Sequence, residues 1–215
     1  IIELNCSGEE LGSRQLIALD VSGCTALQKL NCRFNKLTAL DVSGCTALKE
    51  LICNSNELST LDASGLTALQ ELNCSINQLT ALDVSGLKAL QELICNNNKI
   101  PELNVQGLTE LQKLYCDSNQ LSTLDVQGCS ALKSLTCYKN KLNADVFTKL
   151  FNDLPKWEES DGAEAILYIK KTGVPEGNCT DFSTPESLKK AFEDAKNIKH
   201  WKMQKVDNVG FPEDI

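Results

Sequence analysis

Cysteine is the residue type with the greatest chemical potential in this chain, and one returns at every twenty-first position. The six positions are Cys32, Cys53, Cys74, Cys95, Cys116 and Cys137. A thiol can act as a nucleophile or a metal ligand, but reactivity needs an exposed site with a basic neighbour. Catalytic cysteines are not copied six times in register, and the only histidine, His200, lies far away in sequence. We therefore predict that these thiols pack as small hydrophobic groups.

Disulfides do not fit this spacing either. Stacked coils would place equivalent cysteines about 4.8 Å apart with parallel side-chain directions, whereas a disulfide needs Cβ atoms about 3.8 Å apart that converge. The total of 11 cysteines is also odd. The sequence thus predicts reduced thiols and no metal site, and it leaves the redox compartment open.

A column of carboxylates also repeats, and a row of this kind can suggest calcium. Its members are Asp20, Asp41, Asp62, Asp83 and Asp125, interrupted by Asn104. Each precedes a turn of the type V/A-S-G or V-Q-G, where an Asp side chain can accept a hydrogen bond from the backbone two residues on. The neutral Asn104 retains that turn chemistry without the charge. We predict turn capping for this column.

The elements that position both columns repeat with the same period. One repeat reads Leu27-x-x-Leu30-x-Cys32-x-x-Asn35-x-Leu37, and further copies begin at Leu48, Leu69, Leu90, Leu111 and Leu132. A fixed period of this length is typical of a solenoid, in which each coil buries its apolar side against its neighbours. The pattern resembles the leucine-rich repeat signature L-x-x-L-x-L-x-x-N-x-L, with cysteine in the third leucine slot. The slot asparagines should satisfy buried backbone groups at a turn: Asn35, Asn56, Asn77, Asn98, Asn119 and Asn140.

The second half of each repeat has the same inward rhythm, so we expect short parallel strands on both faces of a gently curved stack. The fold class is a β-rich leucine-rich-repeat solenoid, α/β by the convention for such repeats, with a small α/β C-terminal cap. Residues 1–26 are expected to form an irregular N-terminal capping coil with a protruding loop around Gly8 to Ser13, and residues 27–142 the solenoid.

The period fails after Leu142, and residues 143–206 are expected to form the cap. An amphipathic helix should run from Asn143 to Leu154, followed by a strand at 166–169 and a final strand at 201–206. A second helix should end near Asn197 and begin either with Thr184 as N-cap before Pro185, or with Ser183 and Glu186 as a capping box. Residues 207–215 should be a frayed acidic tail.

The charge balance excludes some partners. The formal net charge is −8 and the pI is near 4.8, which argues against nucleic acid and against an anionic membrane surface. No apolar run approaches the roughly 20 residues of a membrane helix. The chain starts in mid-pattern without a signal peptide, so we take it as a mature or trimmed chain. The absence of a targeting signal therefore does not indicate its cellular location.

The stretch L-D-V-S-G-C-T-A-L at 40–48 resembles a 21-residue class of bacterial leucine-rich repeats, common in surface and secreted proteins of gut-dwelling bacteria. The helix Ala144 to Pro155, the strand Leu167-Tyr168-Ile169 and the segment Trp201 to Val206 are similar to the end region of those proteins. The resemblance implies an exported, extracellular or cell-surface protein, with a lipid anchor as one means of attachment. It supplies no catalytic residues. The loops at Glu158–Glu164 and Gly173–Asp181 are longer here than the connections usual in that family.

The first functional hypothesis is a binding scaffold that recognises a protein or a glycan through the outward side of the cysteine-bearing strands, acting as a monomer. Outward positions vary between repeats although inward ones do not, so the fold does not dictate them. Aromatic and aliphatic side chains with a charged rim are typical of recognition patches. The predicted ligand-binding residues are Ile94, Tyr115, Tyr138, Glu92, Lys113 and Glu71.

Two other hypotheses are a structural spacer and an enzyme. In a structural spacer without a dedicated ligand, the outward columns would serve solubility alone. An enzyme such as a leucine-rich-repeat ubiquitin ligase would need a large separate domain with a nucleophilic cysteine. The residues after Leu142 are too few for that domain, and Cys179 has no histidine near it in sequence. We therefore predict no enzymatic activity, no catalytic residue and no cofactor.

Overall fold

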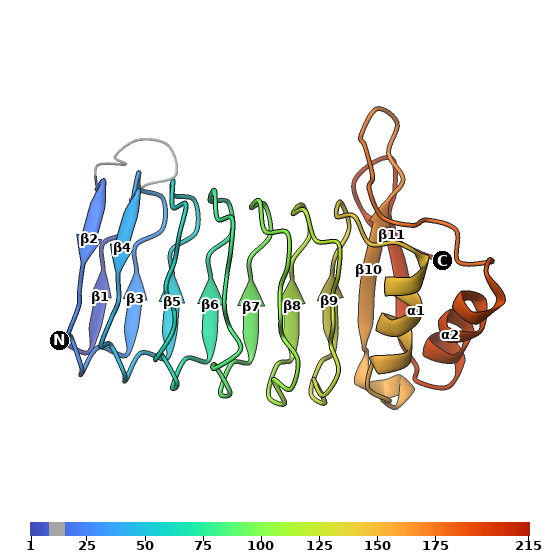
Figure 1. The fold of residues 1–215 in the computed structure, drawn as a ribbon, viewed down its shortest axis with the longest axis horizontal. Helices are drawn as coiled ribbons and strands as arrows, with labels where there is room; N and C mark the ends of the chain where they lie inside the picture. Colours follow the sequence, from blue (N-terminus) through green and yellow to red (C-terminus); the bar gives the residue numbers. More distant parts are fainter. Residues whose placement is uncertain (9–15) are drawn as a thin grey trace.

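The computed structural model describes residues 1–8 and 16–215 and shows an elongated row of stacked coils (Figure 1). Along one face, ten strands form a single sheet in the order β1-β3-β5-β6-β7-β8-β9-β10-β11-β12. The strands of the repeats are β1 (Glu3–Asn5), β3 (Lys29–Asn31), β5 (Glu50–Ile52), β6 (Glu71–Asn73), β7 (Glu92–Ile94), β8 (Lys113–Tyr115) and β9 (Ser134–Thr136). We call this sheet the cysteine-bearing sheet. From β3 to β9 each residue pairs in parallel with its counterpart in the next repeat, so the predicted solenoid is confirmed.

Each strand of the repeats is only three residues long because a turn lies at both of its ends. The central leucine of the strand points inward. Leu72 and the cysteine two positions later, Cys74, are fully buried, as are the leucines Leu69 and Leu79 of the same coil. Burial of one leucine side chain stabilises the fold by about 1.5–3 kcal/mol. Because each inner coil is covered on both sides by another repeat, the same slot requires a similar residue size in each repeat.

The turn after each strand contains one residue in the left-handed region. These residues are Phe34, Ser55, Ile76, Asn97, Ser118 and Lys139, with φ between 51° and 57°. Only Asn97 is of a type that favours this conformation, and the β-branched Ile76 at φ 52° is strained there. The asparagine that follows each of them makes contacts, described below, that hold the turn in place.

The opposite face of the stack carries less regular structure than the sequence predicts. Strands β2 (Ala18–Asp20) and β4 (Ala39–Asp41) form a two-stranded parallel sheet, and farther along Asn104 and Asp125 form an isolated bridge. The predicted second sheet is therefore present only in part. On this face the Asp turn interrupts the backbone directly after the extended residues, so few consecutive residues are free to pair.

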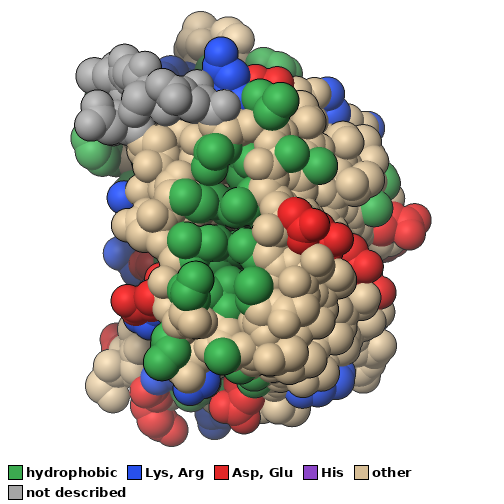
Figure 2. Space-filling view, turned by 90° about the vertical axis from the view of Figure 1, so that its left-hand side faces the viewer, with side chains coloured by type: hydrophobic (Ala, Val, Ile, Leu, Met, Phe, Trp, Pro, Cys, Tyr) green, Lys and Arg blue, Asp and Glu red, His purple; other side chains and the backbone are tan. Residues whose placement is uncertain are grey.

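The first coil covers the inner side of the second, but its own outward side shows a hydrophobic band (Figure 2). Leu4, Cys6, Leu16 and Leu19 occupy core slots yet are only partly buried, whereas the equivalent Leu30 of the next coil is fully buried. The predicted protruding loop lies, except for Gly8, outside the described residues. Gly8 is held close to the second coil, where its N–H donates to Arg33 O (2.9 Å).

At the other end, α1 (Ala144–Asp153), η1 (Glu159–Asp161), β10 (Glu164–Ile169), α2 (Glu186–Asn197), β11 (Lys202–Val206) and β12 (Pro212–Asp214) seal the stack. Strand β10 pairs in parallel with β9, and β11 with β10, so the cap extends the cysteine-bearing sheet. Helices α1 and α2 pack on each other (Figure 1). The predicted strand-helix-strand unit beside a helix is confirmed. The helix predicted from Asn143 to Leu154 is α1, and Asn143 caps its start, because its Oδ1 accepts from Val146 N–H (3.0 Å).

Two predictions about the cap are wrong. Neither Thr184 nor Ser183 caps α2, which begins after Pro185 with no side-chain cap. Ser183 is engaged elsewhere, because its hydroxyl and its N–H donate to Asp181 Oδ1 (2.6 and 2.9 Å).

The residues from Asp207 onward are not a frayed tail. β12 pairs antiparallel with β11, whose edge would otherwise be open. Two ion pairs cross this ladder, between Lys202 and Asp214 (3.3 Å) and between Lys205 and Glu213 (3.1 Å).

Candidate binding surface on the cysteine-bearing sheet

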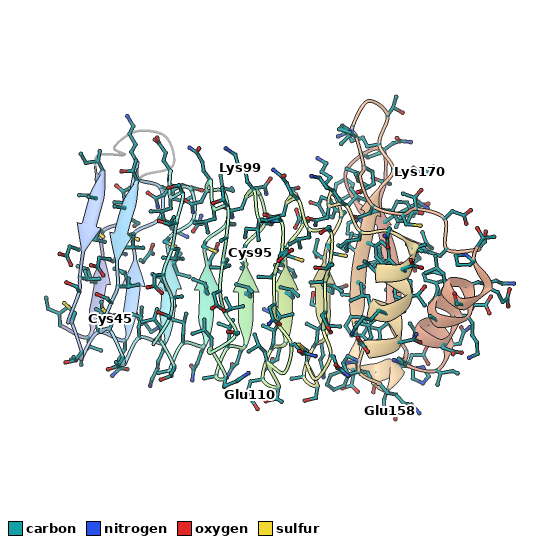
Figure 3. The ribbon with its side chains drawn as sticks, in the orientation of Figure 1. Cys45, Cys95, Lys99, Glu110, Glu158 and Lys170 are labelled. Atoms are coloured by element: carbon teal, nitrogen blue, oxygen red, sulfur yellow. The ribbon has the colours of Figure 1, made fainter. Side chains whose placement is uncertain are left out.

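The six column cysteines lie inside the stack and are fully buried, as Figure 3 shows for Cys95. Burial raises the pKa of the Cys32 and Cys74 thiols to about 12, and it raises the pKa of Cys95 as well. No disulfide joins cysteines among the described residues. A buried, protonated thiol is a poor nucleophile and a poor metal ligand. The prediction that these side chains are core packing is confirmed.

The asparagine column, Asn35 to Asn140, forms an asparagine ladder that ties each coil to its neighbours. Asn98 is representative: its Nδ2 donates to Cys74 O (3.1 Å) and Cys95 O (3.0 Å), and its Oδ1 accepts from Leu79 N–H (2.9 Å). One side chain thus satisfies three buried backbone groups in two successive coils. The predicted structural role is confirmed.

The carboxylate column caps turns, as predicted. Asp62 Oδ1 accepts from Ser64 N–H (2.8 Å), and Asn104 makes the equivalent bond to Gln106 N–H (3.0 Å). Hydrogen bonds from Ser64 lower the pKa of Asp62. Within residues 1–8 and 16–215, no group of three His, Cys, Asp or Glu side chains is placed to hold a metal ion.

The strand register brings together five of the six predicted binding residues. Glu71, Glu92 and Lys113 are consecutive partners on β6, β7 and β8. Ile94 and Tyr115 are partners on β7 and β8, one outward position farther along the same strands. We call these five residues the sheet patch. Their assembly follows from the repeat period alone, because parallel pairing in register aligns equivalent positions.

Tyr138 stands apart from the sheet patch, because it lies beyond the end of β9 and turns toward Asp117. Burial, the charge of Asp117 and a hydrogen bond to that carboxylate raise the pKa of Tyr138 to about 12. Asp117 itself is 4% exposed. Burial raises the pKa of Asp117, although hydrogen bonds from Ser118 and Tyr138 oppose the shift.

The apolar part of the surface is less exposed than predicted. Ile94, Tyr115 and Tyr138 are each half-buried. Paired strands lie close together, so long side chains on neighbouring strands shield one another. The Tyr115 hydroxyl also accepts a hydrogen bond from Ser134 Oγ (3.3 Å), which anchors the ring over β9.

Sequence reasoning missed two residues that join the sheet to the cap. Asn178, from the long loop before α2, continues the asparagine ladder: its Nδ2 donates to Cys137 O (2.8 Å) and its Oδ1 accepts from Leu142 N–H (2.9 Å). The Glu176 carboxylate accepts from the backbone N–H groups of Lys139 (2.9 Å) and Ile169 (2.6 Å). The signal available was an E-x-N sequence in an unusually long loop, which outside the period is too weak to interpret.

Cys179 is partly exposed, and its Sγ donates to Asp181 O (3.2 Å). None of the helices in the described part of the chain is long and apolar enough to cross a membrane.

No protein-family model matches the chain, and no curated protein matches it. Solved structures do match. The functional domain of InlJ from Listeria monocytogenes, which includes a cysteine ladder, is similar with a TM-score of 0.54 and 30% sequence identity, over 88% of this chain and 42% of that chain. A leucine-rich repeat protein of Leptospira interrogans is similar with a TM-score of 0.57 and 22% identity, over 83% of this chain and 49% of that chain. The chain has the leucine-rich-repeat fold.

This leucine-rich-repeat chain spans less than half the length of either bacterial protein that it resembles. The likeness includes stacked cysteines: the InlJ domain has a cysteine ladder, and six buried cysteines stack in register here.

Proposed function

We propose that this leucine-rich-repeat chain is a non-enzymatic scaffold that binds a protein through the sheet patch. The observation that carries the proposal is the contrast between the two sides of the same strands. Inward positions repeat leucine and cysteine, whereas the outward positions of β6, β7 and β8 bring Ile94 and Tyr115 beside Glu92 and Lys113. An apolar centre with a charged rim matches the composition of protein interfaces.

The site of action that fits this proposal is the bacterial cell surface or the extracellular space. Support comes from the resemblance of the repeat to those of surface and secreted bacterial proteins, and from similarity to bacterial leucine-rich-repeat structures. Fractionation of the native organism, followed by detection of the chain with a specific antibody, tests the location. Recovery from the cytoplasmic fraction alone would contradict it.

The patch is tested with the double variant Ile94→Ala/Tyr115→Ala. Tyr138 is left unchanged, because its hydroxyl holds the buried Asp117 and its removal would disturb folding. The control is Ile17→Ala/Ile198→Ala, which removes two exposed isoleucines (67% and 54% exposed) outside the patch. All three proteins are immobilised and exposed to bacterial and host-cell extracts and to a glycan array.

We expect wild type and the control to capture the same protein and the patch variant to lose at least 90% of that capture, as truncation of central anchors does. The urea midpoints of all three proteins should agree closely. Capture that survives in the patch variant would retire the sheet patch. Capture of a glycan in place of a protein, or of nothing, would overturn the proposal in favour of a glycan receptor or a spacer.

A further inference from the structure

The first residue of each of five successive strands in the cysteine-bearing sheet points outward and carries a charge. Lys29, Glu50, Glu71, Glu92 and Lys113 stand on five successive strands in register. Three adjacent carboxylates are flanked by a lysine on either side, and beyond Lys29 the row continues with Glu3 of β1, whose Oε1 lies 3.7 Å from Lys29 Nζ. These side chains, with Lys49 and the glutamines Gln70, Gln91 and Gln112, line a hollow of about 290 Å³.

The two outer carboxylates are already neutralised within the chain. Lys29 Nζ lies 3.1 Å from Glu50 Oε2, and Lys113 Nζ lies 2.9 Å from Glu92 Oε2. Among the described residues, no cation lies within ion-pair distance of Glu71. Glu71, at the centre of the hollow, therefore has no ion-pair partner in the described part of the chain.

Like charges side by side on neighbouring strands are unfavourable. Burial, together with the neighbouring Glu50 and Glu92, raises the pKa of Glu71, with Lys113 and Lys29 opposing the shift. Glu71 thus carries its charge in a half-buried position at a cost that Lys113 and Lys29 offset only in part. A cation from outside would offset that cost.

On the basis of the proposed function, we propose that the protein partner of the sheet patch places one arginine or lysine side chain over Glu71, between the two internal ion pairs. An apolar side chain of the same partner packs beside it on Ile94 and Tyr115. The lysines that flank the three carboxylates admit a single cation and repel a polybasic segment. Arginine suits the hollow best, because its planar group of five donors can bond the carboxylate of Glu71 and the glutamine oxygens together. A glycan supplies neither the cation nor the apolar side chain.

The probe is a displayed library of random 12-residue peptides, selected on the wild-type chain. Selected peptides are then synthesised, and their dissociation constants are measured on wild type, Glu71→Gln, Tyr115→Ala and Glu110→Gln. Glu110, labelled in Figure 3, is an exposed carboxylate on a turn away from the row and serves as the matched control. Glu71→Gln keeps the size of the side chain and relieves like-charge repulsion, so the variant should fold at least as stably as wild type.

We expect the selected peptides to share one basic residue next to an aliphatic or aromatic residue. Glu71→Gln should weaken their binding roughly tenfold, equivalent to about 1.4 kcal/mol, and added salt should weaken binding to wild type but hardly affect binding to Glu71→Gln. Glu110→Gln should bind as wild type does. Peptides whose binding depends on Tyr115 but is unchanged in Glu71→Gln would contradict the contact between a partner cation and Glu71. Such peptides would still support binding at the sheet patch. A selection whose peptides do not depend on Tyr115, or that yields no peptides, would overturn both.

Discussion

The solenoid and the cap fill their cores in different ways. The repeats use leucine and cysteine at fixed slots, for example Leu93 and Cys95, and bury no tryptophan or phenylalanine. In the cap, Phe151 is fully buried, with ring centroids 5.5 Å from Phe147 and Phe182 and 5.4 Å from Phe192. A slot that is stacked on its own copy must hold a side chain that fits between two identical neighbours. A cap is used once, so its rings can interlock irregularly.

The two regions are nevertheless joined by one device. The asparagine ladder that runs through the repeats continues into the cap at Asn178, whose bonds reproduce those of Asn98. The cap therefore completes the backbone hydrogen bonding of the last coil as well as covering its leucines. Covering alone would leave the last turn with unpaired buried groups.

The largest expected effect tests whether aromatic packing stabilises the cap. Phe151→Ala should lower the free energy of unfolding by about 3–5 kcal/mol, because it opens a cavity among three other rings. Both tryptophans, Trp157 and Trp201, lie in the cap, so their fluorescence reports on it, whereas the rate at which a thiol reagent labels the buried column cysteines reports on the repeats. In urea we expect the fluorescence transition of the variant to precede the exposure of these thiols. Transitions that still coincide would show that cap and solenoid unfold as one unit.

The next effect compares the ladder in its middle and at its end. Asn98→Ala leaves three buried backbone groups without partners and should lower the free energy of unfolding by about 3 kcal/mol. Asn178→Ala removes the equivalent bonds at the cap and should cost a similar amount, but its tryptophan fluorescence should change before the column cysteines become accessible to a thiol reagent. Equal behaviour of the two probes in both variants would contradict a separate role for the ladder at the junction.

A smaller effect of opposite sign is expected at Asp117. The folded-state pKa of this carboxyl is raised, so the charged form is disfavoured in the folded chain and the associated stability is lost as the pH rises through that pKa. Asp117→Asn keeps a hydrogen-bond acceptor for Ser118 and Tyr138 and should raise the free energy of unfolding at pH 7 by about 1 kcal/mol. The gain should shrink as the pH falls toward 4. A gain that does not depend on pH would exclude the buried charge as its cause.

The smallest effect concerns the turn face. Asp83 Oδ1 accepts from Ser85 N–H (2.9 Å), and hydrogen bonds from Ser85 lower the pKa of Asp83. Asp83→Ala should lower the melting temperature by about 1–2 °C. Asp83→Asn keeps the turn hydrogen bond, as the natural Asn104 does, but loses the charge, so it should lower the melting temperature by less. Because the folded-state pKa is lowered, the contribution of the charge is present at neutral pH and lost in acid. A rise in the wild-type melting temperature on addition of calcium would contradict the turn role.

Much of the solenoid could be predicted because the same residue pattern occurs six times in the sequence. The inward cysteines, the asparagine ladder and the pairing of Glu71 with Glu92 and Lys113 all follow from spacing. Where the chain does not repeat, sequence reasoning was weaker. It placed α1 and β11 correctly, but it missed β12, the start of α2 and the role of Asn178, because those depend on contacts between segments far apart in sequence.

By itself, the sequence determined the stacking direction, the buried thiols and the residues that share the outward side of the sheet, since a fixed period leaves only one register in which every leucine is covered. The tertiary structure alone decided how far each outward side chain is exposed, that Tyr138 turns away to Asp117, and that Glu71 has no ion-pair partner among the described residues. The physical reason is that periodicity fixes which residues become neighbours, whereas exposure and charge pairing depend on the conformations those neighbours adopt together.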